Sequence, residues 1–262
     1  MKTRIPSFVV ATLTLLCLAL CPKALAVSPP PDGGYPGGNT AEGQNTLLSL
    51  TSGIYNTAVG FDSLALNTAG NFNTGVGAGA LLLNVGDPTA EDGVENTAIG
   101  AGALLSNSTG SHNTAIGAFA LFNNIGGDFA DGSSNTAVGD SALFNNTTGS
   151  FNVAVGRNAL HDNTEGFSAV AVGGDALAFN TTGPQNTAVG TAALASNTTG
   201  TSNTVVGARA GLLNVSGDNN TGLGREAGQN ITGSGNVCIG AAVFGEAGVD
   251  DTTYVRNINT TT

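Results

Sequence analysis

The sequence lacks tryptophan, has one methionine and contains few charged residues. Only 10% of its 262 residues are charged, whereas ordinary soluble domains have about 25%. This low charge excludes a charged disordered tail and a polybasic nucleic-acid binder. By contrast, 40 residues are glycine and 29 are asparagine, which is not the composition of a close-packed enzyme. Such an excess, without the three-residue period of collagen, indicates either low complexity or a repeat built on tight turns.

The N-terminus has the layout of a secretory signal peptide. Lys2 and Arg4 precede an apolar run at 8–20, and Ala24 and Ala26 are small residues suited to a cleavage site. The run is 13 residues long, shorter than the roughly 20 that a membrane-spanning helix needs. We therefore expect residues 1–26 to be removed after Ala26, and the mature chain to be extracellular or at the cell surface, without membrane insertion.

Cleavage would change the charge and the thiol content. Four arginines would remain against 18 acidic residues, a formal net charge of −14, so nucleic acid and anionic membranes are not expected as partners. Cys17 and Cys21 would also be lost, which leaves Cys238 as the only thiol and excludes an intrachain disulfide.

A pentamer of the type Asn-Thr-Ala-Val-Gly repeats along most of the chain, after a Pro/Gly-rich leader at 27–44. Successive pentamer glycines lie 17 residues apart, except for gaps of 23, 22 and a final 16. Eleven copies at so regular a period predict stacked identical units over 45–240. We expect 241–262 to be a C-terminal cap or linker. The eleven glycines, taken as the structural repeat positions, are Gly60, Gly77, Gly100, Gly117, Gly139, Gly156, Gly173, Gly190, Gly207, Gly224 and Gly240.

The columns of the repeat predict an all-β fold. Within each pentamer the second and fourth residues, Thr and an aliphatic residue, would share one strand face, and the small third residue would lie on the other. An apolar pair such as Ala103-Leu104 follows most of these glycines, and Asn-Thr-Thr-Gly segments such as 146–149 suit a type I turn. We expect two extended arms and two corners per coil, stacked as a parallel β-solenoid of about eleven 17-residue coils. Short helices at the Ala-Leu pairs are the alternative.

Two consequences follow for the side chains. Asn and Thr in columns would hydrogen-bond along the stack, as in other cross-β arrays, and the corners would need residues that tolerate positive φ. The pattern does not fix which strand face is interior. If the small column faces outward, it forms an apolar stripe that includes Ala137 and Ala154 and invites self-association; otherwise alanine fills a narrow core.

The pentamers, with the apolar pair that follows them, resemble the head repeats of YadA-like trimeric autotransporter adhesins over roughly 45–240. Similar arrays occur in tail-fibre-like bacterial surface proteins. The resemblance implies a left-handed β-roll assembled as a homotrimer. It also implies a structural or adhesive role, with a host, matrix or glycan surface as ligand.

Two insertions break the period at the same position of the coil, one at 85–95 and one at 125–132. Insertions on one face of a solenoid often form its binding face, so these acidic loops are a candidate recognition patch. Ordinary solvated loops are the alternative, because loop insertions cost little. The candidate Ca²⁺ ligands are Asp87, Glu91, Asp92, Asp128 and Asp131.

Catalytic constellations are not recognisable in this pattern, and we expect a non-enzymatic protein without cofactors. His112 and His161 fall in different columns, and Cys238 takes the place of alanine in the small column, as a buried thiol would. An ice- or crystal-surface binder that uses the Thr column is one alternative function. A carbohydrate-active β-solenoid is another, although no paired carboxylates lie in adjacent coils at a strand position, where they could do acid/base work.

Overall fold

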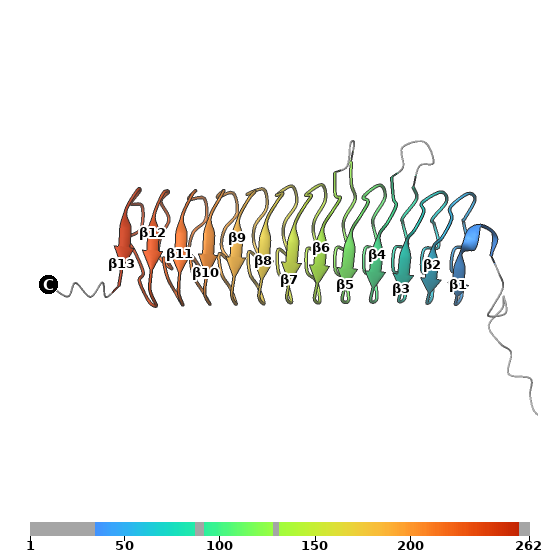
Figure 1. Cartoon of the computed structure of the whole chain (residues 1–262), viewed down its shortest axis with the longest axis horizontal. Coiled ribbons are helices and arrows are strands. Elements are labelled where there is room, and N and C mark those ends of the chain that lie inside the picture. Colours follow the sequence, from blue (N-terminus) through green and yellow to red (C-terminus); the bar gives the residue numbers. More distant parts are fainter. Residues whose placement is uncertain (1–34, 87–91, 128–130, 257–262) are drawn as a thin grey trace, which may run out of the picture. The chain divides into compact units, whose positions relative to one another are not determined.

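The computed structural model describes residues 35–86, 92–127 and 131–256. They belong to the second of two units into which the chain divides, Met1–Gly33 and Gly34–Thr262. Thirteen three-residue strands form one parallel sheet in chain order (Figure 1). A short 3₁₀ helix, η1 (Pro36–Gly38), precedes them. The strands are β1 (Thr40–Glu42), β2 (Thr57–Val59), β3 (Thr74–Val76), β4 (Thr97–Ile99), β5 (Thr114–Ile116), β6 (Thr136–Val138), β7 (Val153–Val155), β8 (Val170–Val172), β9 (Thr187–Val189), β10 (Thr204–Val206), β11 (Thr221–Leu223), β12 (Val237–Ile239) and β13 (Thr253–Val255).

The predicted all-β parallel solenoid is confirmed, but it has more coils than expected. The structure forms about twelve turns, because β1 and β13 extend the ladder on either side of the eleven pentamers. β1 carries Glu42 where the other strands carry an aliphatic residue, and β13 carries Tyr254 where most carry alanine. Because of these departures from the pentamer, the repeat pattern did not predict either strand.

The strands pair in strict register. Each residue pairs with its counterpart one repeat later, for example Thr57 with Thr74. The register is kept across both insertions, where Thr74 pairs with Thr97 and Thr114 with Thr136. Figure 1 shows that the chain leaves and re-enters the stack at one edge at both places. The two insertions therefore leave the strand register unchanged.

The small third column of the pentamer is the interior one. Ala137 and Ala154 have no exposed surface, while Val155 in the fourth column is 37% exposed. The hypothesis that an alanine stripe faces outward and mediates trimerisation was therefore wrong about the face. A two-residue period separates the two faces but does not say which one is inside. Here the narrow coil leaves room only for a small side chain opposite the leucines of the second arm.

The second arm of each coil is not the extended segment that we expected. It is a chain of turns, and in nine coils a buried leucine there adopts a left-handed backbone, with φ near +50° as in Leu64. Its N–H donates to the carbonyl of Ala80 in the next coil at 2.9 Å. A left-handed non-glycine residue costs about 1–2 kcal/mol, and burial of a leucine contributes about 1.5–3 kcal/mol. Burial therefore outweighs the strain. The leucine column consists of Leu47, Leu64, Leu81, Leu104, Leu121, Leu143, Leu160, Leu177 and Leu194.

Glycine occupies the two corners for different reasons. The pentamer glycines have φ between 119° and 141°, which confirms the expected positive φ. At the Asn-Thr-Thr-Gly type of corner the expectation was wrong, because Gly110 is not left-handed. A Cβ on Gly110 would instead lie 2.5 Å from the carbonyl oxygen of Gly132 and 2.6 Å from Oδ1 of Asn107. This glycine is required by the close approach of neighbouring coils.

Candidate functional site

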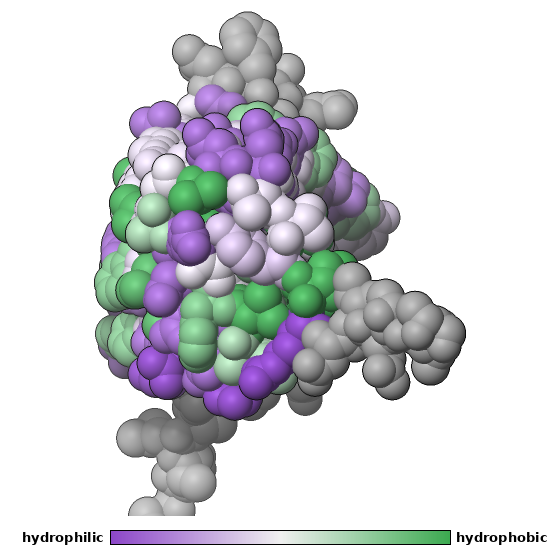
Figure 2. All heavy atoms as spheres, turned by 90° about the vertical axis from the view of Figure 1, so that its left-hand side faces the viewer, coloured by the Kyte–Doolittle hydropathy of each residue, from purple (hydrophilic) through white to green (hydrophobic). Residues whose placement is uncertain are grey.

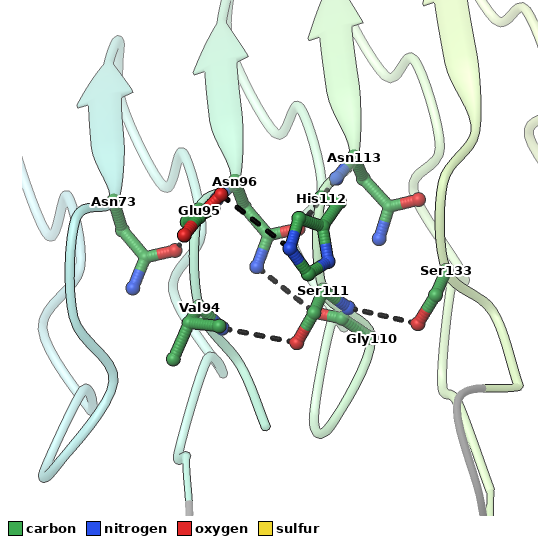
Figure 3. Close-up of polar contacts among 9 residues, drawn as sticks. All are labelled: Asn73, Val94, Glu95, Asn96, Gly110, Ser111, His112, Asn113 and Ser133. Carbon is green, nitrogen blue, oxygen red and sulfur yellow. Dashed lines mark hydrogen bonds and ion pairs between the residues drawn. The ribbon is translucent and has the colours of Figure 1, made fainter. Parts of the chain in front are cut away.

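A buried ladder of asparagines runs along the strands. The N–H of Asn96 donates to Oδ1 of Asn73 at 2.9 Å, and Nδ2 of Asn96 donates to the carbonyl oxygen of Gly110 at 2.9 Å (Figure 3). Asn73 and Asn96 have no exposed surface. Each side chain thus joins a strand to the corner of the next coil. The strand ladder consists of Asn39, Asn56, Asn73, Asn96, Asn113, Asn135, Asn152, Asn186, Asn203, Asn220 and Asn236.

A second asparagine ladder runs along the Asn-Thr-Thr-Gly corners. Nδ2 of Asn107 donates to Oδ1 of Asn84 at 2.7 Å and to the carbonyl oxygen of Gly110 at 2.8 Å, which uses both of its hydrogens. Corner threonines add bonds to the next coil, as from Thr147 Oγ1 to the carbonyl oxygen of Thr164 at 2.9 Å. The expected hydrogen bonding along the stack is confirmed for these residues. The corner ladder consists of Asn67, Asn84, Asn107, Asn124, Asn146, Asn163, Asn180, Asn197 and Asn214.

A third polar column lies just before the strands and runs in the opposite direction. The N–H of Val94 donates to Oγ of Ser111 at 3.2 Å, and the N–H of Ser111 donates to Oγ of Ser133 at 3.0 Å (Figure 3). In this column the acceptor side chain belongs to the following coil, whereas in the strand ladder it belongs to the preceding coil. In all three columns, polar side chains join one coil to the next.

The outward side chains of β2 to β13 form a charge-free surface, which we call the outer strand face. Its aliphatic residues are partly exposed, such as Ile116 at 39% and Val206 at 42%. Within the described ranges, its threonine hydroxyls make no hydrogen bond to another residue. The outer strand face consists of Thr57, Thr74, Thr97, Thr114, Thr136, Val153, Val170, Thr187, Thr204, Thr221, Val237 and Thr253, together with Val59, Val76, Ile99, Ile116, Val138, Val155, Val172, Val189, Val206, Leu223, Ile239 and Val255.

The candidate Ca²⁺ ligands are only partly within the structure. Asp87, Glu91 and Asp128 lie outside the described residues, while Asp92 and Asp131 lie within them. Among the described residues there is no group of three or more His, Cys, Asp or Glu side chains that could hold a metal ion. Calcium binding by these loops stays a prediction.

The two histidines make separate contacts, as their columns predicted. His112 Nε2 lies 3.4 Å from Oε2 of Glu95, and both side chains are 56% exposed (Figure 3). His161 Nδ1 lies 2.7 Å from Oδ1 of Asp162. Neither contact is buried, and the two do not combine into one site.

An aromatic stack was missed by the sequence reasoning. The rings of Phe122 and Phe144 stack with centroids 5.1 Å apart, and His161 stacks on Phe144 at 5.2 Å. All three residues stand five positions after a pentamer glycine, so their column in the repeat could have revealed them. The ring of Phe144 is covered on both faces, which makes the stack a packing feature of the coils.

Cys238 is fully buried in the interior alanine column, as expected. Desolvation by burial raises the pKa of its thiol, although a backbone hydrogen bond with Gly228 acts in the opposite direction. A raised pKa reduces the thiolate fraction on which cysteine reactivity depends. The thiol is therefore protected while the coil around it stays closed.

No protein-family model matches the chain, and no curated protein matches it. Over the ranges that the structure describes, no helix is long and apolar enough to cross a membrane. The fold and its columns define the class of protein: a repeat-built, all-β parallel solenoid.

Proposed function

We propose that this chain is a non-enzymatic structural protein of the cell surface or the extracellular space. Its stacked coils would display an adhesin-like surface and self-associate, with a trimer as the expected assembly. Export rests on the signal-peptide pattern at 1–26, and the trimer rests on the resemblance to YadA-like heads. N-terminal sequencing of the mature protein, starting at Val27, is the result expected for export.

The observation that carries this proposal is that some columns of the repeat join the coils while others form an exposed surface. The leucine, alanine and two asparagine columns are buried and serve to join one coil to the next. The outer strand face is left as a regular surface without charge, in a mature chain that would carry a net charge of −14. Because like charges would repel, two copies can approach most readily through such a neutral face.

The size of the outer strand face is compatible with self-association. Coils about 4.8 Å apart and strands of about 10 Å give a face of roughly 50 Å by 10 Å, or about 500 Å² per copy. Two copies would bury about 1,000 Å², which is the lower end for a specific interface. Exposed aromatic residues beside it, such as the stacked pair Tyr55 and Phe72, would add to this area.

Sedimentation equilibrium of the mature chain tests the assembly. The double variant Ile116→Asp/Val155→Asp puts two carboxylates on the outer strand face and is expected to give a monomer. The matched control is Phe179→Asp, a residue that is 57% exposed on the second arm, away from that face. The proposal fails if the wild type is already monomeric, or if both variants change the mass equally.

A second candidate function is binding to an ice or mineral surface through the same face. It is favoured by the repeated threonine hydroxyls, which have no partner among the described residues. Thr114→Val removes one hydroxyl from the middle of the column and keeps the shape of the side chain. Self-association would survive this change. Thermal hysteresis of the wild type that falls in Thr114→Val would favour the surface binder.

A further inference from the structure

The leucine column stops before the stack ends. Nine coils bury a leucine on the second arm, the last being Leu194. In the next two coils Gly211 and Gly228 take the same position with the same left-handed backbone, at φ of 60° and 64°. The backbone path is therefore kept while the side chain that fills the coil is lost.

The neighbouring columns compensate only in part. Val205 replaces alanine, and its Cγ1 lies 3.2 Å from the place that a Cβ on Gly211 would occupy. In the next coil the strand position is Gly222. A cavity of about 10 Å³ lies here, bordered by Leu194, Gly211, Gly222, Gly228 and other residues. The buried core accordingly falls into two clusters, of which the first ends at Ala210 and the second contains Ala227, Ile231 and Cys238.

The corner asparagine ladder stops at the same place. Nδ2 of Asn214 donates to Oδ1 of Asn197 at 3.0 Å, but Ile231 stands at the next ladder position. The pairing of β10 with β11 continues across the boundary, and so does the strand ladder, where the N–H of Asn220 donates to Oδ1 of Asn203 at 2.9 Å. Backbone bonds of the second arm also cross it, as from the N–H of Gly211 to the carbonyl oxygen of Ala227 at 3.0 Å. The leucine column and the corner ladder are thus missing here.

We propose that the coils of β11 to β13, residues 215–256, form a separate cooperative unit that opens while the coils before it stay folded. The stability of a solenoid is approximately a sum of repeat and neighbour-interface contributions, so the interface with the fewest apolar contacts separates first. Opening exposes Cys238, the one thiol of the expected mature chain. The unit lies at the end of the stack seen in Figure 2, where hydrophobic and hydrophilic residues both reach the surface.

The test combines thiol labelling of the mature protein by Ellman's reagent with amide hydrogen exchange read by mass spectrometry. Amides of β11 to β13 should exchange together, at least about tenfold faster than those of β3 to β8 under conditions where opening limits exchange. Cys238 should be labelled at the same opening rate as these amides exchange. A single shared rate for all strands, with labelling only on global unfolding, would overturn the proposal.

Two variants change the boundary in opposite directions. Val205→Ala/Gly211→Leu rebuilds the common coil and extends the leucine column, so labelling of Cys238 should slow by at least about tenfold. Val205→Ala alone enlarges the cavity and should accelerate labelling, which keeps the test valid if the double variant folds poorly. Unchanged labelling in both variants would contradict a boundary at this position.

Discussion

The side chain of Asn107 donates a hydrogen bond to Oδ1 of Asn84, at 2.7 Å, across a separation of 23 residues. In coils without an insertion the same bond spans 17 residues, as between Asn180 and Asn163 at 2.8 Å. The ladder is therefore maintained by the position of a residue in its coil, not by its distance along the chain.

Removal of a ladder amide should destabilise the solenoid more than removal of an exposed one. Asn107→Ala would leave Oδ1 of Asn84 and the carbonyl oxygen of Gly110 without this donor. We expect a loss of about 1–3 kcal/mol in the free energy of unfolding, measured by guanidinium denaturation. Asn230→Ala, at an exposed position, is the control and should change it by less than about 0.5 kcal/mol. Equal effects would contradict a stabilising ladder.

Replacing a leucine of the leucine column by glycine should destabilise the protein no more than replacing it by alanine. This reverses the usual order, because the backbone there is left-handed. Leu160 is fully buried with φ of 52°. Leu160→Ala should cost about 2–5 kcal/mol through the cavity that it leaves. Leu160→Gly loses nearly the same burial but relieves the backbone strain. We therefore expect glycine to be tolerated at least as well as alanine in thermal denaturation, and a markedly less stable glycine variant would argue against the strain.

Corner glycines should resist substitution even where φ is ordinary. In Gly110→Ala the new Cβ would lie 2.5 Å from the backbone oxygen of Gly132, so neighbouring coils would have to separate. We expect a clear fall in melting temperature. Gly174→Ala is the matched control, because its Cβ would meet only the oxygen of Arg157, at 4.0 Å. A similar melting temperature for both variants would refute the close-approach explanation.

The buried thiol should make stability depend on pH in alkaline solution. Burial raises the pKa of Cys238, so folding favours its neutral form. The unfolded chain loses the thiol proton first, above about pH 8.5. Stability is thus fully present below that pH and falls as pH rises towards the folded pKa. The difference in stability between the wild type and Cys238→Ala should therefore change above about pH 8.5, and a constant difference would show that the thiol ionises equally in both states.

The sequence predicted the parts of the fold that the repeat period controls. The period identified parallel coils in register and placed Gly60 at a left-handed corner, with φ of 127°. It also predicted that asparagines would bond along the stack. These features depend on which residues recur at equal positions, and one sequence contains that information.

Other features depend on packing and were not predictable in the same way. The alternation of side chains along a strand placed Ala154 and Val155 on opposite faces. It could not say which of the two is buried, since alanine suits both a narrow core and a close interface. The second arm was expected to be extended, but Leu160 and its equivalents have a left-handed backbone, which is unusual for leucine. For the candidate recognition loops, the ligands Asp87, Glu91 and Asp128 lie outside the described residues.

The central claim is that the interior of the coil is lined by the third residue of each strand and that the fourth forms a surface for self-association. Sedimentation velocity of Ala154→Asp and Val155→Asp tests it on adjacent residues. Our account predicts a slowly sedimenting, expanded chain for Ala154→Asp, because a charge would be buried. It predicts a compact species smaller than the wild-type assembly for Val155→Asp. A compact Ala154→Asp together with an expanded Val155→Asp would contradict it.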